Sequence, residues 1–207
     1  MNRLKFIASL VDNNSVLSDI GCDHGKLIYY VINRIKKAYA IDNKRLPLDR
    51  AYKLLNSYDN VYFSLSDGLS NLATDTTIIS ITGMGGLNII DILSRGYNKL
   101  ENRKLILLSH NNLYKLRKYL NQNKISILDE YIIKDRSYYE IIIAKRSDIP
   151  QNYDENDLIF GPILRMKKEN IFCAKWEFEL TKWKSMSVNI NSIKMIKLIE
   201  EEIYENK

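Results

Sequence analysis

The stretch VLSDIGCDHGKLIYY, residues 16–30, decides the fold, because it joins a strand pattern to a helix pattern through a short glycine loop. Residues 16–20 form a brief apolar run that indicates a strand, and residues 26–35 have the pattern of a helix. Gly21 and Gly25 stand between them, where glycine permits a tight turn or a ligand lying against the backbone. The stretch therefore predicts the first strand, loop and helix of an α/β domain.

The alternation of strands and helices continues through the middle of the chain. Further strands are expected at residues 37–42, 60–67, 76–83 and 104–109, and further helices at residues 46–57, 83–96 and 111–123. Two longer strands, residues 124–135 and 137–146, follow almost without a break and should pair antiparallel. We predict a mainly parallel, doubly wound seven-stranded sheet with right-handed crossovers and a terminal antiparallel hairpin. Ligands of such sheets lie at the carboxyl ends of the strands.

Helices are also expected near both ends of the chain. The first carries an apolar stripe made of Leu4, Ile7, Ala8 and Val11. A polar stretch containing Pro150 then precedes two helical segments, residues 158–186 and 189–206. The later segment has an isoleucine stripe made of Ile193, Ile196, Ile199 and Ile203. Two such helices would pair as a short antiparallel coiled coil, so we expect one domain at residues 1–150 and a helical hairpin at residues 151–207.

The composition limits the class of protein. The chain has 207 residues, of which 45% are hydrophobic and 27% charged, as in ordinary soluble domains. No apolar run approaches the roughly 20 residues that span a bilayer, so we expect a cytoplasmic protein without a membrane partner. Cys22 and Cys173 are expected to be free thiols. The net charge is +6, with basic clusters in residues 33–53 and 165–184, which favours a basic face and a polyanionic partner.

Three interpretations of the GCDHG loop fit poorly. A phosphate-binding P-loop needs four residues between its glycines and a Ser or Thr where Leu27 stands, but GCDHG has only three. A metal site needs more ligands than the Cys-Asp-His run at residues 22–24, and His110 and Cys173 are isolated. A nucleophilic Cys22 lacks a distinctive partner pattern. We therefore expect no metal and no catalytic cysteine.

A cofactor turn fits the loop better. The pattern D-x-G-x-D-x-G differs from the dinucleotide pattern G-x-G-x-x-G, and S-adenosylmethionine has no pyrophosphate to be cradled. Asp19, Asp42 and Asp67 each stand at the end of a predicted strand. Asp19 would accept from the methionine ammonium, Asp42 would bind the ribose hydroxyls, and Asp67 would accept from the adenine amino group. Helix capping by Asp42 and an ordinary Asp-Gly turn at Asp67 stay open as alternatives.

Seven motifs in order carry a family resemblance. They are DIGCDHGKL (19–27), AIDNKRLPLDRA (40–51), SDGL (66–69), ITGMGGLNI (81–89), LILLSHNN (105–112), YYEIII (138–143) and FGPILRMKKENIF (160–172). With them the chain resembles the bacterial tRNA (adenine-N1)-methyltransferases that modify adenosine 22 of the D-arm, from Arg3 to about Trp176. The hairpin is shorter than is usual there, and Cys22 and Gly25 stand where Ser and Ala are common. The resemblance implies a Rossmann-like class I methyltransferase fold, S-adenosylmethionine as methyl donor and tRNA as substrate.

The same resemblance implies that Asp23 and Arg3 are catalytic residues. A ring nitrogen attacks through an in-plane lone pair, so it needs orientation more than a base. Residues 83–86 lack the Asn/Asp-Pro-Pro-aromatic motif that grips an exocyclic amine, which argues against methylation at N6. We hypothesise that Asp23 accepts a hydrogen bond from the adenine N6 group and stabilises the cationic product. The alternative role of Asp23 is to cap the next helix. Arg3 would bind a phosphate or the target base, and its alternative is a solvated helix arginine.

The remaining site residues are predicted in two groups. The cofactor group comprises Asp19, Gly21, Cys22, His24, Gly25, Asp42, Asp67, Gly68, Gly83, Met84 and Gly85. The substrate group comprises Gly86, Asn111, Asn112, Tyr139, Lys44, Arg45, Lys167 and Lys168. The alternative role of Asn112 is to cap its helix. The alternative for the tyrosines of SYYEIII is that they lie half-buried in the core. Because N1 lies on the Watson–Crick edge, the adenine should be extruded from any pairing.

Other functions fit the sequence less well. A methyltransferase with another RNA or a small molecule as substrate is the first alternative, and a non-catalytic RNA-binding relative is another. A nicotinamide-dependent oxidoreductase is disfavoured because Asp23 stands where its loop requires glycine. We expect the protein to act as a monomer.

Overall fold

The computed structural model describes residues 2–149, 151–187 and 189–205. The chain divides into two compact units, Met1–Ile163 and Leu164–Lys207. The division falls later in the chain than residue 150, because α6 (Glu155–Phe160) packs against α5 (Leu113–Gln122) in the first unit. Each unit is therefore described by itself.

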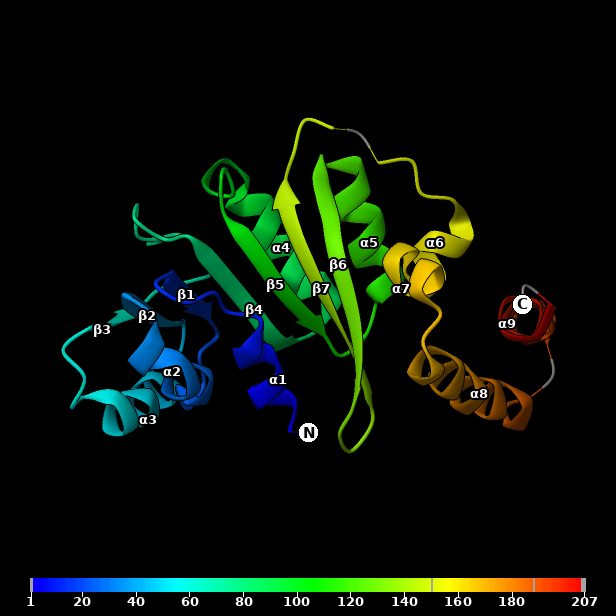
Figure 1. Cartoon of the computed structure of the whole chain (residues 1–207), viewed down its shortest axis with the longest axis horizontal. Helices are drawn as coiled ribbons and strands as arrows, with labels where there is room; N and C mark the ends of the chain where they lie inside the picture. Colours follow the sequence, from blue (N-terminus) through cyan, green and yellow to red (C-terminus); the bar gives the residue numbers. More distant parts are fainter. Residues whose placement is uncertain (1, 150, 188, 206–207) are drawn as a thin grey trace. The chain divides into compact units, whose positions relative to one another are not determined.

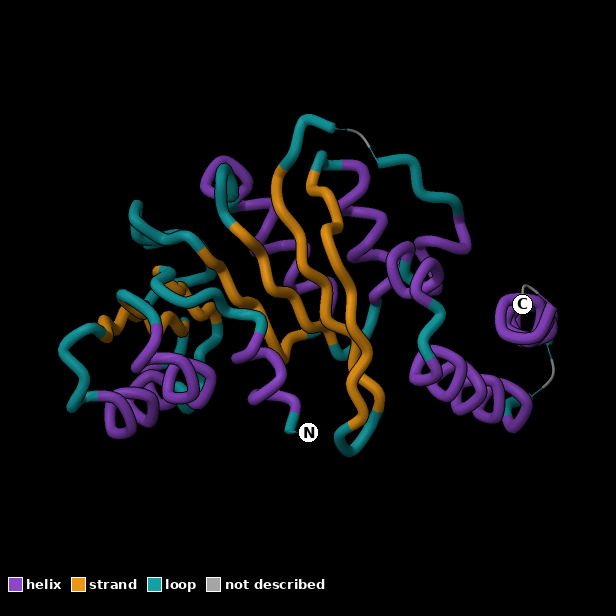
Figure 2. Tube along the Cα trace, viewed as in Figure 1, coloured by secondary structure: helices purple, strands orange, loops and turns teal. Residues whose placement is uncertain are grey.

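A seven-stranded sheet forms the centre of the first unit, as the sequence predicts (Figures 1 and 2). The strand order is β3-β2-β1-β4-β5-β7-β6, with β7 antiparallel to both of its neighbours and all other pairs parallel. The strands are β1 (Val16–Ile20), β2 (Lys37–Asp42), β3 (Val61–Leu65), β4 (Ile78–Met84), β5 (Lys104–Ser109), β6 (Ile125–Lys134) and β7 (Tyr138–Arg146). The parallel strands therefore end at one edge of the sheet, where their loops meet.

Helices cover both faces of this sheet and bury two separate cores. Helices α1 (Arg3–Ser9), α2 (Lys26–Val31) and α3 (Arg45–Leu55) pack on one face, and α4 (Gly86–Arg95) and α5 pack on the other. Short helical turns follow α2 and α4 at Ile32–Arg34 and Tyr97–Lys99. Ile7, Ile28 and Ile106 are fully buried in the first core, and each such side chain contributes roughly 1.5–3 kcal/mol when removed from water.

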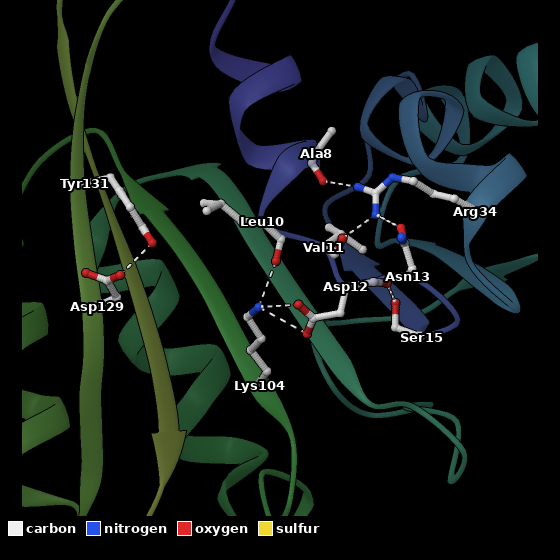
Figure 3. Close-up of polar contacts among 10 residues, drawn as sticks. All are labelled: Ala8, Leu10, Val11, Asp12, Asn13, Ser15, Arg34, Lys104, Asp129 and Tyr131. Carbon is white, nitrogen blue, oxygen red and sulfur yellow. Dashed lines mark hydrogen bonds and ion pairs between the residues drawn. The ribbon is translucent and has the colours of Figure 1, made fainter.

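The N-terminal helix is anchored to the body of the first unit by side chains from elsewhere in the sequence. Its stripe is confirmed, since Ile7 and Ala8 are buried. The guanidinium of Arg34 donates to the backbone carbonyls of Ala8 and Val11, and the ammonium of Lys104 donates to the carbonyl of Leu10 over 2.8 Å (Figure 3). These bonds cap the carbonyls at the end of α1. They hold the helix, and with it Arg3, in a defined place.

The single helix predicted over residues 158–186 is wrong. The chain instead forms α6, α7 (Pro162–Lys167) and α8 (Asn170–Ser185). Gly161 has a φ of 95°, which a helix does not allow, and Lys168 has a φ of 46°. Both positions interrupt the helical path, so three shorter helices replace one.

A buried arginine holds α6 in the first unit. The side chain of Arg117 on α5 is fully buried, lies 2.8 Å from a carboxylate oxygen of Glu130 and also pairs with Glu140. Its guanidinium donates to the carbonyl of Ile159 as well. Burial raises the pKa of Glu130, against the opposing effect of Arg117. The cluster joins α5, β6, β7 and α6 through groups that would be costly to bury without partners.

In the second unit α8 packs against α9 (Ile190–Glu200), which continues into a π-helical turn at Glu201–Glu205. The predicted isoleucine stripe holds only in part. Ile199 and Ile203 are buried, but Ile193 is 53% exposed. The guanidinium of Arg165 pairs with Glu202 over 3.0 Å within this unit.

Candidate active site

A cavity of about 680 Å³ opens at the carboxyl ends of β1, β2, β3 and β4. Its wall is made by the loops after these strands and after β5, together with parts of α1 and α4. The volume lies within the usual range for small-molecule sites. Of the predicted site residues, those that line it are Arg3, Asp19, Gly21, Cys22, Asp23, His24, Asp42, Lys44, Asp67, Gly68, Gly83 and Met84.

The loop after β1 has the tight turn that its glycines predict. Gly21 has a φ of 70°, and a Cβ atom there would lie 2.1 Å from the terminal methyl of Met84. Gly25 has a φ of 68° and is buried, and its Cβ would lie 2.6 Å from a methyl of Leu55 on α3. Gly21 thus makes room for the side chain of Met84, whereas Gly25 allows α2 and α3 to approach each other.

Asp19 contributes a buried carboxylate to the cavity. It is 3% exposed, and burial raises its pKa to about 7, against the effect of the Ser80 hydroxyl and with a further rise from Asp42. No Lys or Arg side chain of the described residues pairs with it. A buried carboxylate of this kind is stabilised by a cationic ligand, and the methionine ammonium of S-adenosylmethionine is one.

Asp42 holds its carboxylate in place through backbone donors. One oxygen accepts from the amide of Lys44 over 2.9 Å, and the other accepts from the amide of Asp23 over 3.3 Å. The N-cap residue of α3 is Lys44, whose own side chain makes no capping hydrogen bond, and Asp42 lies two residues before it, so Asp42 is not the N-cap residue. Asp42 is 8% exposed and lines the cavity, which fits an acceptor for a pair of hydroxyl groups.

Asp67 is held by an arginine that the sequence analysis did not identify. The guanidinium of Arg95 on α4 donates to its two carboxylate oxygens over 2.6 and 3.3 Å, and donates to Asp91 over 3.0 Å. The bond from Arg95 lowers the pKa of Asp67. Asp67 is therefore ionised at neutral pH and is an acceptor for an amino group.

Asp23 lies at the cavity with its backbone in the left-handed region, at a φ of 47°. Asp tolerates this conformation better than most residues other than glycine. Its carboxylate is 2.6 Å from Nδ1 of His24. The N-cap of α2 is Gly25, and no side chain caps that helix, so the alternative role of Asp23 as a helix cap is wrong.

Cys22 does not have the properties of a nucleophile. It is 6% exposed, and burial raises the pKa of its thiol, with further rises from Asp19 and Asp42. The thiol is therefore protonated at neutral pH, whereas the reactive form of cysteine is the thiolate. This agrees with the interpretation of Cys22 as a small loop residue.

Three side chains from distant segments form a cluster at the edge of the cavity, which we call the ring cluster: Arg3, His110 and Tyr139. The guanidinium carbon of Arg3 lies 4.5 Å from the centre of the Tyr139 ring, and the His110 ring lies 6.0 Å from it, edge to face. Arg3 and His110 line the cavity, whereas Tyr139 lies beside it. His110 was missed by the sequence analysis because it was taken as isolated, although it follows the end of β5, where ligands of such sheets bind.

Several predicted residues do not line the cavity. Gly86 allows the backbone of Asn111 to approach closely, because a Cβ atom at Gly86 would lie 2.6 Å from the Asn111 carbonyl oxygen. Asn111 accepts from the amide of Gly86 over 3.2 Å, and Asn112 is the N-cap of α5 without a capping side-chain bond. Those outside the cavity lining in the first unit are Gly25, Arg45, Gly85, Gly86, Asn111, Asn112 and Tyr139. Lys167 and Lys168 belong to the second unit.

The part of the chain that the structure describes contains neither a candidate metal centre nor a membrane-spanning helix. No group of three or more His, Cys, Asp or Glu side chains in that part of the chain is arranged to hold a metal ion. No helix there has the length and apolar character needed to cross a bilayer.

Solved structures resemble this chain over nearly its full length. Streptococcus pneumoniae Sp1610 in complex with S-adenosyl-L-methionine is 28% identical, with 98% of each chain covered and a TM-score of 0.91. M. capricolum TrmK in complex with S-adenosyl-homocysteine is 26% identical, with 100% of this chain and 96% of that chain covered and a TM-score of 0.81. Both relatives therefore share the fold of this chain.

The order of the strands and the carboxylate-lined cavity at their ends define a class I methyltransferase that uses S-adenosylmethionine. The family model described as TrmK, tRNA (adenine(22)-N(1))-methyltransferase, matches residues 17–207. The tRNA (adenine(22)-N(1))-methyltransferase of Bacillus subtilis is 29% identical over 201 residues, which are 91% of this chain and 84% of that protein. The chain belongs to the TrmK family.

Proposed function

We propose that this member of the TrmK family transfers the methyl group of S-adenosylmethionine to N1 of adenosine 22 in tRNA, and that the cavity is its active site. The observation that carries the proposal is the meeting of four aspartates, Asp19, Asp23, Asp42 and Asp67, at one cavity. Asp19, Asp42 and Asp67 are positioned to bind the cofactor, and Asp23 is left to bind the target adenine. When bound, the cofactor supplies an electrophilic methyl group on a sulfonium.

The three cofactor aspartates bind polar groups of different kinds. Asp19 pairs with the methionine ammonium, which compensates its buried charge. Asp42 is oriented by two backbone amides and accepts from the ribose hydroxyls. Asp67 accepts from the adenine amino group and keeps Arg95 as its partner. Gly21 lines the cavity, where its backbone contacts the aminoacyl part of the cofactor.

Asp23 acts on the target adenine. It accepts a hydrogen bond from the N6 amino group, which increases the electron density at N1 and stabilises the positive charge that develops on the ring. No base is needed, because N1 of adenine carries no proton at neutral pH. Orientation of the lone pair toward the methyl group supplies most of the remaining effect.

The ring cluster is the platform for the extruded adenine. Extruded bases are held by stacking on aromatic rings and guanidinium planes. Tyr139 supplies an aromatic ring and Arg3 a guanidinium, whose carbon lies 4.5 Å from the centre of that ring, beside the cavity. Arg3 also offers a donor to a phosphate of the same nucleotide.

Basic residues hold the tRNA backbone. Lys44 and Arg45 are exposed at the start of α3, and Lys44 lines the cavity. Lys167 and Lys168 supply positive charge from the second unit. Such contacts position the RNA and carry no sequence information. We further propose that the enzyme works as a cytoplasmic monomer without a metal ion.

The proposal is tested with an unmodified tRNA transcript and methyl-labelled S-adenosylmethionine. We expect 1-methyladenosine at position 22, mapped by nuclease digestion and mass spectrometry, and no product from a transcript with guanosine at that position. Methylation of another nucleotide, or binding of tRNA without methyl transfer, would contradict it and favour another RNA substrate or a non-catalytic role.

A further inference from the structure

A chain of three side chains connects α3 to the carboxylate of Asp23. Nη1 of Arg50 lies 3.3 Å from Nε2 of His24, and Nδ1 of His24 lies 2.6 Å from Oδ2 of Asp23. Arg50 belongs to α3, whereas His24 and Asp23 belong to the loop after β1. The three residues therefore link two separate elements beside the cavity.

The direction of these hydrogen bonds follows from the chemistry of the groups. A guanidinium has only donors, so Nε2 of His24 must accept from Arg50. A neutral imidazole with an acceptor at Nε2 carries its proton at Nδ1. That proton is donated to Oδ2 of Asp23. Arg50 thereby selects one tautomer of His24.

The same arrangement orients the carboxylate of Asp23. One oxygen is engaged by His24, while Oδ1 has no hydrogen-bond partner among the described residues. The backbone amide of Asp23 is tied to Asp42 over 3.3 Å. Because the side chain of Asp23 is 66% exposed, packing alone does not restrict its rotation.

We propose that Arg50 and His24 are positioning residues, which lock the Asp23 carboxylate so that its free oxygen faces the amino group of the target adenine. The proposal rests on the function proposed for Asp23 and goes beyond it, because Arg50 does not line the cavity and neither residue needs to touch the base. It also changes the role of His24 from cofactor ligand to support for the catalytic carboxylate.

Two conservative substitutions of His24 separate the proposal from a general structural role. Asparagine places its amide nitrogen near the position of Nδ1, and glutamine places it near the position of Nε2. We expect His24→Asn to keep kcat within about threefold of the wild type and His24→Gln to lower it about 10- to 100-fold. The Kd of S-adenosylmethionine, measured by calorimetry without tRNA, should stay within about twofold in both.

Arg50→Ala should lower kcat about tenfold, since the tautomer is then no longer selected. Lys53→Ala is the matched control, because Lys53 is an exposed cation on the same helix. The chain has 2 histidines, so nitrogen-15 spectra of the ligand-free protein resolve both rings. We expect His24 to carry its proton at Nδ1 in the wild type and to become a mixture of tautomers in Arg50→Ala.

Each part of the experiment can overturn the inference. Equal loss of kcat in the asparagine and glutamine variants, an Nε2-protonated ring in the wild type, or a normal kcat in Arg50→Ala would contradict it. A large increase in the cofactor Kd with unchanged kcat would make His24 a cofactor ligand instead. A wild-type enzyme without activity on tRNA refutes the proposed function, whereas the tautomer measurement still decides whether Arg50 controls His24.

Discussion

Arg3 lies against the face of the Tyr139 ring, with its guanidinium carbon 4.5 Å from the ring centre. The two residues come from opposite ends of the first unit's sequence, Arg3 from α1 and Tyr139 from β7. Arg34 and Lys104 bind backbone carbonyls at the end of α1, the helix that carries Arg3 (Figure 3 shows these bonds). The contact places a cation and an aromatic ring together beside the cavity at the carboxyl ends of the strands.

Replacing Tyr139 tests this surface as the stacking platform for the base. Tyr139→Phe keeps the ring and should keep kcat/KM for tRNA within about threefold, whereas Tyr139→Ala should lower it about 10- to 100-fold, as expected for one lost stacking contact. Steady-state kinetics with varied tRNA measure this effect. An unchanged cofactor Kd shows that the variant is folded, and equal activity of the two variants would exclude stacking.

Removing the carboxylate of Asp23 should stop methyl transfer without releasing the cofactor. We expect Asp23→Ala to lower kcat by about 100-fold or more, because a group that interacts with developing charge is lost. Asp23→Asn removes the charge without straining the backbone, since Asn also tolerates the φ of 47°, and it should lose turnover as well. Both variants should bind S-adenosylmethionine within a few-fold of the wild type by calorimetry. Near-normal turnover in either would rule out the role of the charge.

The affinity for the cofactor should depend on pH through Asp19. Burial raises the pKa of this carboxyl to about 7, and only its ionised form attracts the ammonium of the cofactor. The Kd should therefore fall about fivefold between pH 6 and pH 7, as the ionised fraction grows, and level off above the pKa. Asp19→Asn should bind more weakly and lose this dependence. A Kd that is constant with pH in the wild type would contradict the assignment.

The same carboxyl should affect stability in the opposite direction. The pKa of Asp19 in the folded state lies above the unfolded value near 3.8. The contribution of this carboxyl to the free energy of unfolding is therefore fully present below pH 3.8, where it is protonated in both states. This stability is lost as the pH rises through about 7. We expect Asp19→Asn to have a higher Tm than the ligand-free wild type at pH 8 and little difference at pH 5. Thermal unfolding at the two pH values measures both effects.

Arg117 should be important for stability and not for chemistry. Arg117→Met removes the guanidinium that pairs with the buried carboxylates of Glu130 and Glu140, which should lower the free energy of unfolding by about 3–5 kcal/mol. Lys115→Met on the exposed side of α5 is the control, and its expected change is below about 0.5 kcal/mol. Urea unfolding followed by circular dichroism distinguishes them. Equal stability of the two variants would show that the buried cluster contributes little.

Binding of tRNA should weaken steeply with salt. If Lys44 and Arg45 each contact a phosphate, replacing either by alanine should reduce the slope of log K against log salt by about one. Fluorescence anisotropy with labelled tRNA between low and high salt measures the slopes. A flat dependence in the wild type would contradict backbone recognition by basic side chains.

The local sequence pattern is sufficient to predict the order of strands and helices and the glycine loop after the first strand. The alternation of strands and helices predicts the sheet, because hydrophobic periodicity is a property of neighbouring residues. The sequence also places three aspartates near strand ends, since Asp19 is the penultimate residue of β1, Asp42 is the last residue of β2 and Asp67 lies two residues after β3. The break of the C-terminal segment at Gly161 was missed, although a glycine followed by a proline is a local signal.

Only the tertiary structure decides which distant side chains meet. The ion pair of Asp67 with Arg95, the bond of His24 with Arg50 and the contact of Arg3 with Tyr139 join residues from separate elements. No periodicity in the chain encodes these pairs, because they depend on how the strands are ordered and how the helices are packed. The sequence by itself determined the sheet and placed Asp19, Asp42 and Asp67 near the ends of its strands, whereas the packing of helices on that sheet determined which side chains lie beside Asp23.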